Sequence, residues 1–197
     1  MILPVRPHFF FDKLPADCPP FIIPVPKRST DSPTQLELAI LIAVGRIVGI
    51  GPGKDIFEIG TYKGATALML SLNFPGTADD PNVITLDLDL GQSAGLLNNA
   101  NVMALEGHSM AFDLSEFHGT CGMVFIDGAH DEQTAFSDSG RAVELLPDDG
   151  PAAIVWHDYD PDHWPGVVNA VGRFDCNGES PIYRVEDTRL AVYLREK

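Results

Sequence analysis

The sequence predicts an α/β fold, a doubly wound and mostly parallel sheet of seven strands that closes with a C-terminal antiparallel hairpin. Short, continuously apolar runs alternate with helical segments from residue 35 onwards, which is typical of a parallel sheet covered on both faces. Only residues 186–189 separate the last two apolar runs, and so short a connection permits only a hairpin. The length of 197 residues and the 45% hydrophobic content fit one globular domain.

Residues 1–33 are predicted to form an extended, proline-rich arm, and residues 34–197 the folded domain. The arm holds 8 of the 16 prolines, which argues against a regular helix or a central strand there. Its apolar runs Phe9–Phe11 and Phe21–Ile23 are unfavourable in water. We therefore expect the arm to lie on the body of the protein or on a partner chain, with a disordered tail as the alternative.

The first helix of the domain is expected to begin at Ser32-Pro33-Thr34-Gln35, a capping box with proline at the first helical position. It should end at Gly49, because glycine readily adopts the left-handed conformation that terminates helices. The strands expected after it are Ile56–Ile59, Val83–Leu86, Val102–Leu105, Met123–Ile126, Ala152–Trp156, Ile182–Val185 and Leu190–Leu194. The clearest helices between the strands are Ala65–Leu72, Glu132–Leu146 and Val167–Phe174.

The charge and the cysteines limit the partners and the compartment. A net charge of −15 argues against nucleic acid and anionic membranes and favours a small neutral or cationic ligand. The longest apolar run, Leu38–Ile50, contains Arg46 and is too short to cross a bilayer. Three widely spaced cysteines predict neither a disulfide framework nor a zinc site, and the opening residues do not resemble a signal peptide. We expect a soluble, cytoplasmic protein.

The residues that follow each strand are the candidates for ligand binding, because ligands of such sheets bind beyond the carboxyl ends of the strands. Gly60 and Gly64 allow a tight turn and a free helix N-terminus, although such glycines can also be purely structural. Their E-x-G-x-x-x-G spacing differs from the G-x-G-x-x-G of dinucleotide binders. Asp87 follows Gly64 by 23 residues, the distance at which an acidic residue binds a ribose diol; Asp89 is the second choice.

Five motifs in order resemble the Rossmann-like class I S-adenosylmethionine-dependent methyltransferases, in particular the small subgroup akin to macrocin-type O-methyltransferases and cephalosporin hydroxylase-like proteins. The motifs are Phe57–Gly64, Asp87, Glu106–Ser109, Phe125–His130 and Ile154–Tyr159. The resemblance covers about residues 35–195 and implies S-adenosylmethionine as the cofactor. The cofactor-binding residues that it implies are Glu58, Gly60, Thr61, Gly64, Asp87, His108, Ser109 and Asp127.

Within that resemblance, Asp127 and Asp158 end the fourth and fifth strands of the predicted sheet, which should be neighbours. Two converging carboxylates could hold Mg²⁺ or another divalent cation, and the adjacent His157 would suit a transition metal better. Asp127 and Asp158 are also catalytic candidates, because without a metal their repulsion should raise the pKa of one of them and make it a possible base. His130 is our candidate general base, because histidine titrates near physiological pH. The alternative is that His130 only positions its loop.

The function predicted from these residues is methyl transfer from S-adenosylmethionine to a hydroxyl of a small molecule, such as a sugar or a natural product. One alternative is a protein that binds the cofactor without catalysing a reaction. Another is a dinucleotide-dependent oxidoreductase on the same fold. The expected partner is a small-molecule acceptor rather than nucleic acid or a membrane, and the apolar arm makes a homodimer a candidate arrangement.

Overall fold

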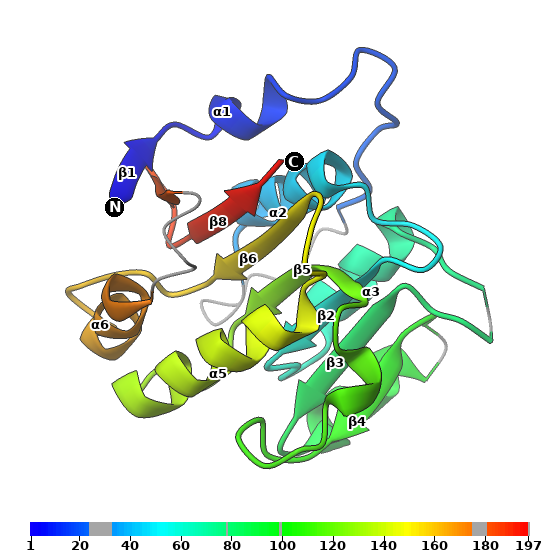
Figure 1. Cartoon of the computed structure of the whole chain (residues 1–197). Helices are drawn as coiled ribbons and strands as arrows, with labels where there is room; N and C mark the ends of the chain where they lie inside the picture. Colours follow the sequence, from blue (N-terminus) through cyan, green and yellow to red (C-terminus); the bar gives the residue numbers. More distant parts are fainter. Residues whose placement is uncertain (24–32, 78, 99, 175–180, 197) are drawn as a thin grey trace.

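The computed structural model describes residues 1–23, 33–77, 79–98, 100–174 and 181–196 (Figure 1). The strands in this part of the chain are β1 (Ile2–Val5), β2 (Asp55–Ile59), β3 (Val83–Asp87), β4 (Met103–Glu106), β5 (Cys121–Ile126), β6 (Ala152–Trp156), β7 (Ile182–Val185) and β8 (Ala191–Arg195). The helices are α1 (His8–Phe11), α2 (Gln35–Val48), α3 (Ala65–Asn73), α4 (Ala94–Leu97), α5 (Glu132–Leu145) and α6 (Pro165–Arg173). Two short 3₁₀ turns span Leu90–Gln92 and Ser115–Phe117.

All eight strands of the described residues belong to one sheet, in the order β1-β7-β8-β6-β5-β2-β3-β4. The pairs formed among β2 to β6 are parallel, whereas β8 runs antiparallel to both β6 and β7. The predicted doubly wound sheet with a terminal antiparallel hairpin is therefore confirmed. The chain proceeds to one side from β2 and to the other side from β5, so these neighbours mark the point where the strand order reverses, the usual ligand position.

The sheet has one strand more than expected, because Ile2–Val5 pairs in parallel with β7. Pro4 is tolerated there because β1 is an edge strand: the neighbouring odd-numbered residues bond to β7, and Pro4 lacks its N–H on the unpaired outer side. The expectation of no regular helix in this segment is also wrong, because α1 forms a single turn between Pro7 and Pro15. Short elements fit between prolines where longer ones cannot.

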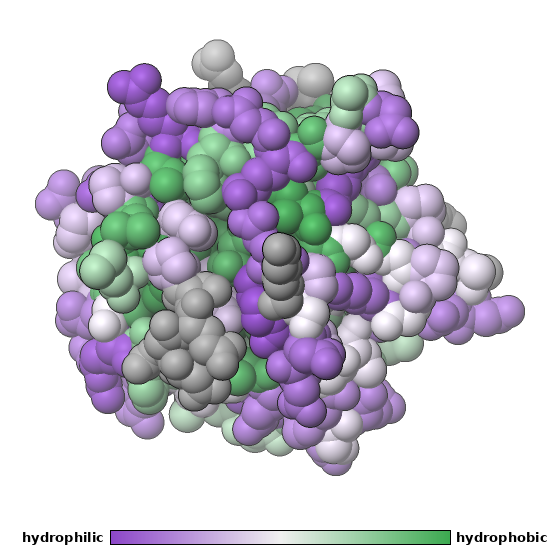
Figure 2. Space-filling model, turned by 45° about the horizontal axis from the view of Figure 1, so that its top comes forward, coloured by the Kyte–Doolittle hydropathy of each residue, from purple (hydrophilic) through white to green (hydrophobic). Residues whose placement is uncertain are grey.

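The opening segment lies on the body of the same chain. Phe10 is fully buried. The rings of Phe9 and Tyr183 in β7 pack at a tilt, with their centroids 4.7 Å apart. Further along, the backbone of Ile22 forms hydrogen bonds with the side chain of Asn73 in α3. Figure 2, turned so that this side of the molecule comes forward, shows hydrophobic side chains at the surface in separate groups among hydrophilic ones.

Helix α2 begins two residues later than the sequence pattern indicated. Its N-cap is Thr34, whose hydroxyl accepts a hydrogen bond from the Glu37 N–H, while the Glu37 carboxylate accepts one from the Thr34 N–H at 2.7 Å. The expected cap, Ser32, lies outside the described residues. The helix ends as predicted at Gly49, which has a φ of 76°.

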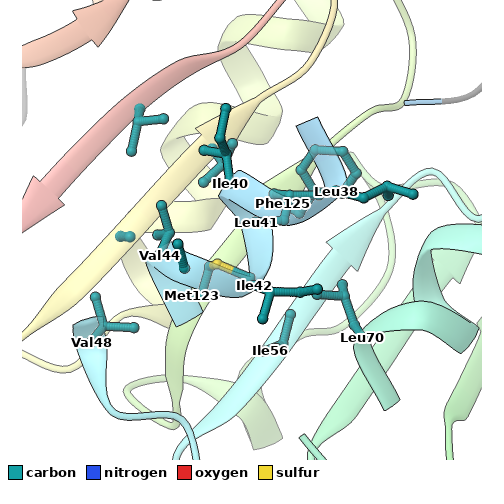
Figure 3. Close-up of a cluster of buried hydrophobic side chains, with 14 of the residues drawn as sticks. Leu38, Ile40, Leu41, Ile42, Val44, Val48, Ile56, Leu70, Met123 and Phe125 are labelled. Atoms are coloured by element: carbon teal, nitrogen blue, oxygen red, sulfur yellow. The ribbon is translucent and has the colours of Figure 1, made fainter. Parts of the chain in front are cut away.

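The core has two layers, one on each face of the sheet. Helix α2 covers β5 and β6 on one face, and Figure 3 shows its apolar side chains over Met123 and Phe125. Helices α5 and α6 cover the other face, where Trp156 is fully buried. Burial of both faces explains why the central strands are mostly apolar. Among the described residues, no helix is long and apolar enough to cross a membrane.

Candidate active site

A cavity of about 640 Å³ lies at the carboxyl ends of the central parallel strands. It extends from Asp87, at the end of β3, past the turn that follows β2 to the side chains beyond β5 and β6. The sequence-predicted residues that line it are Gly60, Thr61, Asp87, His108, Ser109, Asp127, His130, His157 and Asp158. Its volume is within the usual range for small-molecule and cofactor sites, about 300–1,000 Å³.

The turn after β2 depends on Gly60. Its φ is 100°, and a Cβ at this position would lie 2.1 Å from the carbonyl oxygen of Asp127 on the neighbouring strand. The Asp87 Oδ2 atom holds the next residues of the turn by accepting hydrogen bonds from the N–H groups of Thr61 at 2.8 Å and Tyr62 at 2.7 Å. Tyr62 has a positive φ of 46°, so these bonds maintain a backbone conformation that a tyrosine rarely adopts.

Glu58 lies inside the protein below this turn, and neither Glu58 nor Gly64 lines the cavity. The Thr85 hydroxyl donates to the Glu58 carboxylate, and the Thr85 and Thr61 hydroxyls are 2.6 Å apart. Burial raises the pKa of Glu58 to about 8, opposed by the Thr85 hydrogen bond and reinforced by the negative charges of Asp127 and Asp87. Glu58 is therefore protonated at neutral pH. It supports the turn through Thr85, whose hydroxyl contacts that of Thr61.

At the other end of the cavity, His157 is buried among three carboxylates. Its Nδ1 atom lies 3.0 Å from Asp127 and 3.3 Å from Asp158, and its Nε2 atom lies 3.5 Å from Glu37. Burial by itself would lower the pKa of His157, but the interactions with these carboxylates raise it to about 11. His157 is therefore a buried imidazolium ion that holds the strand ends and the start of α2 together.

Asp158 connects this group to the cavity. Its Oδ1 accepts a hydrogen bond from Arg189 Nη1 at 2.7 Å, and its Oδ2 lies 2.8 Å from His130 Nε2. Burial alone would raise the pKa of Asp158, but the hydrogen bonds from the two histidines and the charges of His157 and Arg189 keep it well below its usual range. The expectation that Asp158 could gain a raised pKa and act as a base is therefore wrong, because cationic neighbours surround it. The Trp164 ring stacks on His130 with centroids 3.9 Å apart, so His130 is fixed both by a hydrogen bond and by packing.

The expected proximity of Asp127 and Asp158 is confirmed. One ligand-capable atom from each of them and one from His157 all lie within 4.8 Å of one another. The two strands are adjacent in the sheet, and each of these residues follows the end of its strand. Asp158 has a positive φ of 55°, which turns the chain sharply just after β6.

Three site residues were missed from the sequence. Glu37 was not singled out, although it is buried in the site and has a pKa lowered to about 2; burial opposes this shift, and hydrogen bonds from His157 and from two backbone N–H groups outweigh it. Arg189 lies in the hairpin turn, which the pattern indicated only as a connection. Asp138 lies on α5 and borders the cavity although it is fully buried. A polar residue on the apolar face of a helix is the signal that could have identified Asp138.

The comparisons with known proteins agree with this architecture. The family model described as a methyltransferase domain matches residues 57–159, which is just over half of the chain. The chain belongs to this methyltransferase domain family. The match begins in β2 and ends just after β6, so it includes the turn with Gly60, the strand end with Asp87 and the residues Asp127, His130 and Asp158. No curated protein sequence matches the chain.

Solved structures of methyltransferases share the fold. CalS11, a TDP-rhamnose 3′-O-methyltransferase of calicheamicin biosynthesis, superposes with a TM-score of 0.60 at 17% identity, covering 79% of this chain and 77% of that one. The SAH-bound methyltransferase PaMTH1 of Podospora anserina gives 0.63 at 18% identity, covering 85% and 80%. A Corynebacterium glutamicum protein gives 0.61 at 16% identity, covering 84% and 82%. At these identities, the similarity establishes the fold.

Proposed function

We propose that this methyltransferase transfers the methyl group of S-adenosylmethionine to a hydroxyl oxygen of a small molecule, such as a sugar or a natural product. The observation that carries the proposal is the hydrogen-bonded pair of His130 and Asp158 in the same cavity as the Gly60 turn and Asp87. The structural similarity to a sugar O-methyltransferase supports the proposed acceptor class. A homodimer and a cytoplasmic location remain predictions.

The cavity residues fit the cofactor in charge and shape. Gly60 and Thr61 both line the cavity, and Gly60 allows the turn to pass close to the backbone of Asp127. Among the described residues, the Asp87 Oδ1 atom accepts a single hydrogen bond, from the Asp89 N–H at 3.2 Å, so it is the oxygen that would accept from a ribose hydroxyl. When bound, S-adenosylmethionine supplies an electrophilic methyl group on a positively charged sulfur. The carboxylates at this end of the cavity favour such a positive charge.

His130 would accept the proton of the acceptor hydroxyl while the new carbon–oxygen bond forms. Asp158 engages Nε2 of the ring, so Nδ1 is the nitrogen that would take the proton. The carboxylate of Asp158, held ionised by Arg189, then stabilises the imidazolium ion that results. Stacking on Trp164 fixes the plane of the ring and so sets the direction in which it accepts the proton.

A divalent cation would be held by Asp127, His157 and Asp158. The donor set of two carboxylates and one imidazole suits a transition metal better than Mg²⁺. An ion held there would supply Lewis-acid chemistry, which lowers the pKa of a nearby acceptor hydroxyl. His157 and Arg189 already neutralise these carboxylates, so an ion would compete with these contacts, and His157 would have to lose its proton to become a ligand.

The proposal is tested first by ligand binding. S-adenosylhomocysteine should raise the melting temperature and NAD(P) should not; the opposite result would favour a dinucleotide-dependent enzyme. Turnover is then measured as S-adenosylhomocysteine release with a panel of sugar and phenolic acceptors, with EDTA or with added Mg²⁺, Mn²⁺ or Zn²⁺. Binding without turnover on any acceptor would favour the non-catalytic alternative.

The role of His130 is tested by H130A, with H118A as the matched control. His118 is a partly exposed histidine that pairs with Glu144 at the surface. H130A should reduce kcat by about 100-fold or more while leaving the affinity for S-adenosylhomocysteine unchanged. Full activity of H130A would exclude His130 as the base.

A further inference from the structure

Asp138 is a buried carboxylate that forms no hydrogen bond of 3.5 Å or less with the described residues, although the Ser109 hydroxyl lies near enough to affect its charge. Its side chain has no exposed surface, and neither Oδ1 nor Oδ2 forms a hydrogen bond within the described part of the chain. Arg141, one turn further along α5, donates to the carbonyl oxygen of Phe112. Burying a carboxylate without a donor is costly, because its hydration is lost and nothing replaces it. A bound ligand could supply the missing donor.

Asp138 borders the same cavity as the His130–Asp158 pair. A Cβ on Gly128, in the cavity wall, would lie 3.6 Å from Asp138 Oδ2, so no side chain stands between this oxygen and that wall. Burial raises the pKa of Asp138, and the Ser109 hydroxyl and the charges of Arg141 and His108 act in the opposite direction. The residues 108 and 109 follow β4, the strand next to the one that ends in Asp87.

We infer that Asp138 accepts a hydrogen bond from the exocyclic amino group of the cofactor's adenine. The inference rests on the proposed function, in which Asp87 binds the ribose. The base attached to that ribose would extend into the part of the cavity formed by Gly128, Ser109 and Asp138. A carboxylate accepts hydrogen bonds, and the amino group is the N–H donor on the edge of adenine. The site therefore selects a 6-aminopurine.

The test is a double-mutant cycle between protein and ligand, measured by calorimetry. The ligands are S-adenosylhomocysteine and its analogue with unsubstituted purine, which retains the ring nitrogens and lacks the amino group. The wild type should bind the analogue at least about 10-fold more weakly, the effect of losing a hydrogen bond to a charged group. D138A should bind both ligands with affinities within about 2-fold of each other.

The control is D131N, an acid-to-amide change at another cavity residue on the same helix. Asp131 caps α5 by accepting from Thr134 N–H, a role that asparagine also fills, so D131N should discriminate between the ligands like the wild type. D138N, of nearly identical shape, provides a second variant if D138A does not fold. The melting temperature of ligand-free D138N should equal or exceed that of the wild type, because the change removes an unpaired buried charge.

The outcomes separate the inference from the function on which it rests. If the wild type does not bind S-adenosylhomocysteine, the proposed function fails. If the wild type binds both ligands equally, or if D138A and D138N keep the wild-type discrimination, Asp138 does not recognise the amino group and the inference is overturned. Loss of discrimination in the Asp138 variants, with D131N unaffected, supports it.

Discussion

Replacing His157 by asparagine removes a buried positive charge from Glu37, Asp127 and Asp158, which lie 3.0–3.5 Å from its ring nitrogens. Breaking a buried ion pair by removing one partner costs about 3–5 kcal/mol. The pKa of His157 gives a separate upper limit: a rise from 6.5 to about 11, at about 1.4 kcal/mol for each tenfold change in proton affinity, corresponds to about 6 kcal/mol. We expect H157N to lower the free energy of unfolding by about 3–5 kcal/mol at pH 6.

The effect should depend on pH in a defined direction. A group whose pKa is higher in the folded state stabilises fully below its unfolded pKa, and its contribution declines as the pH rises through the folded pKa. The contribution of His157 is therefore complete below pH 6.5 and falls steadily toward pH 11. Glu37, with a pKa lowered to about 2, stabilises above pH 4.5 and loses this contribution as the pH falls toward 2. The difference between H157N and the wild type should be largest between pH 4.5 and 6.5.

The assay is urea-induced unfolding followed by circular dichroism at pH 6 and pH 9, with EDTA present so that no metal ion contributes. The control is H163N, because His163 is an exposed histidine that pairs with Asp160 at the surface and should contribute less than about 1 kcal/mol. A loss below about 1 kcal/mol for H157N at pH 6, or equal losses at pH 6 and pH 9, would refute a buried imidazolium ion at this position.

Two further predictions concern the cofactor and the N-terminal segment. D87A should weaken S-adenosylmethionine binding by about 1.5–3 kcal/mol in calorimetry, the effect of losing a hydrogen bond to a charged group. An unchanged affinity would show that Asp87 does not bind the ribose and would make Asp89 the next candidate. Deleting residues 1–30 should lower solubility or change the mass in light scattering, because the segment covers apolar surface. F10A alone should lower the free energy of unfolding by about 3–5 kcal/mol, because Phe10 is fully buried. I22A should have little effect, because the Ile22 side chain is 51% exposed. A truncated chain with unchanged solubility, mass and melting temperature would contradict the prediction for the deletion.

The central strands could be predicted accurately because they are buried on both faces. The strands β2, β3, β5 and β6 appear in the sequence as predominantly apolar runs, interrupted by the buried polar residues Glu58 in β2 and Thr85 in β3. Their observed bounds differ from the predicted ones by at most two residues. The strand β1 was missed because it contains Pro4, and the many prolines of this segment argued against a regular element, although an edge strand accepts a proline. The hydrophobic pattern of the sequence predicts strands that are buried on both faces, and it does not identify strands at the edge of the sheet.

The sequence by itself determined the doubly wound fold, the order of the ligand-binding turns and the proximity of Asp127 and Asp158, since adjacent parallel strands end at the same edge of a sheet. Only the tertiary structure decided how these groups are charged. Glu37 and Arg189 are separated by 152 positions, yet the carboxylate of one accepts a hydrogen bond from the backbone of the other at 2.7 Å. The protonation of His157 and Glu58 depends on burial and on neighbouring charges, which are properties of position in space. No local sequence pattern records them.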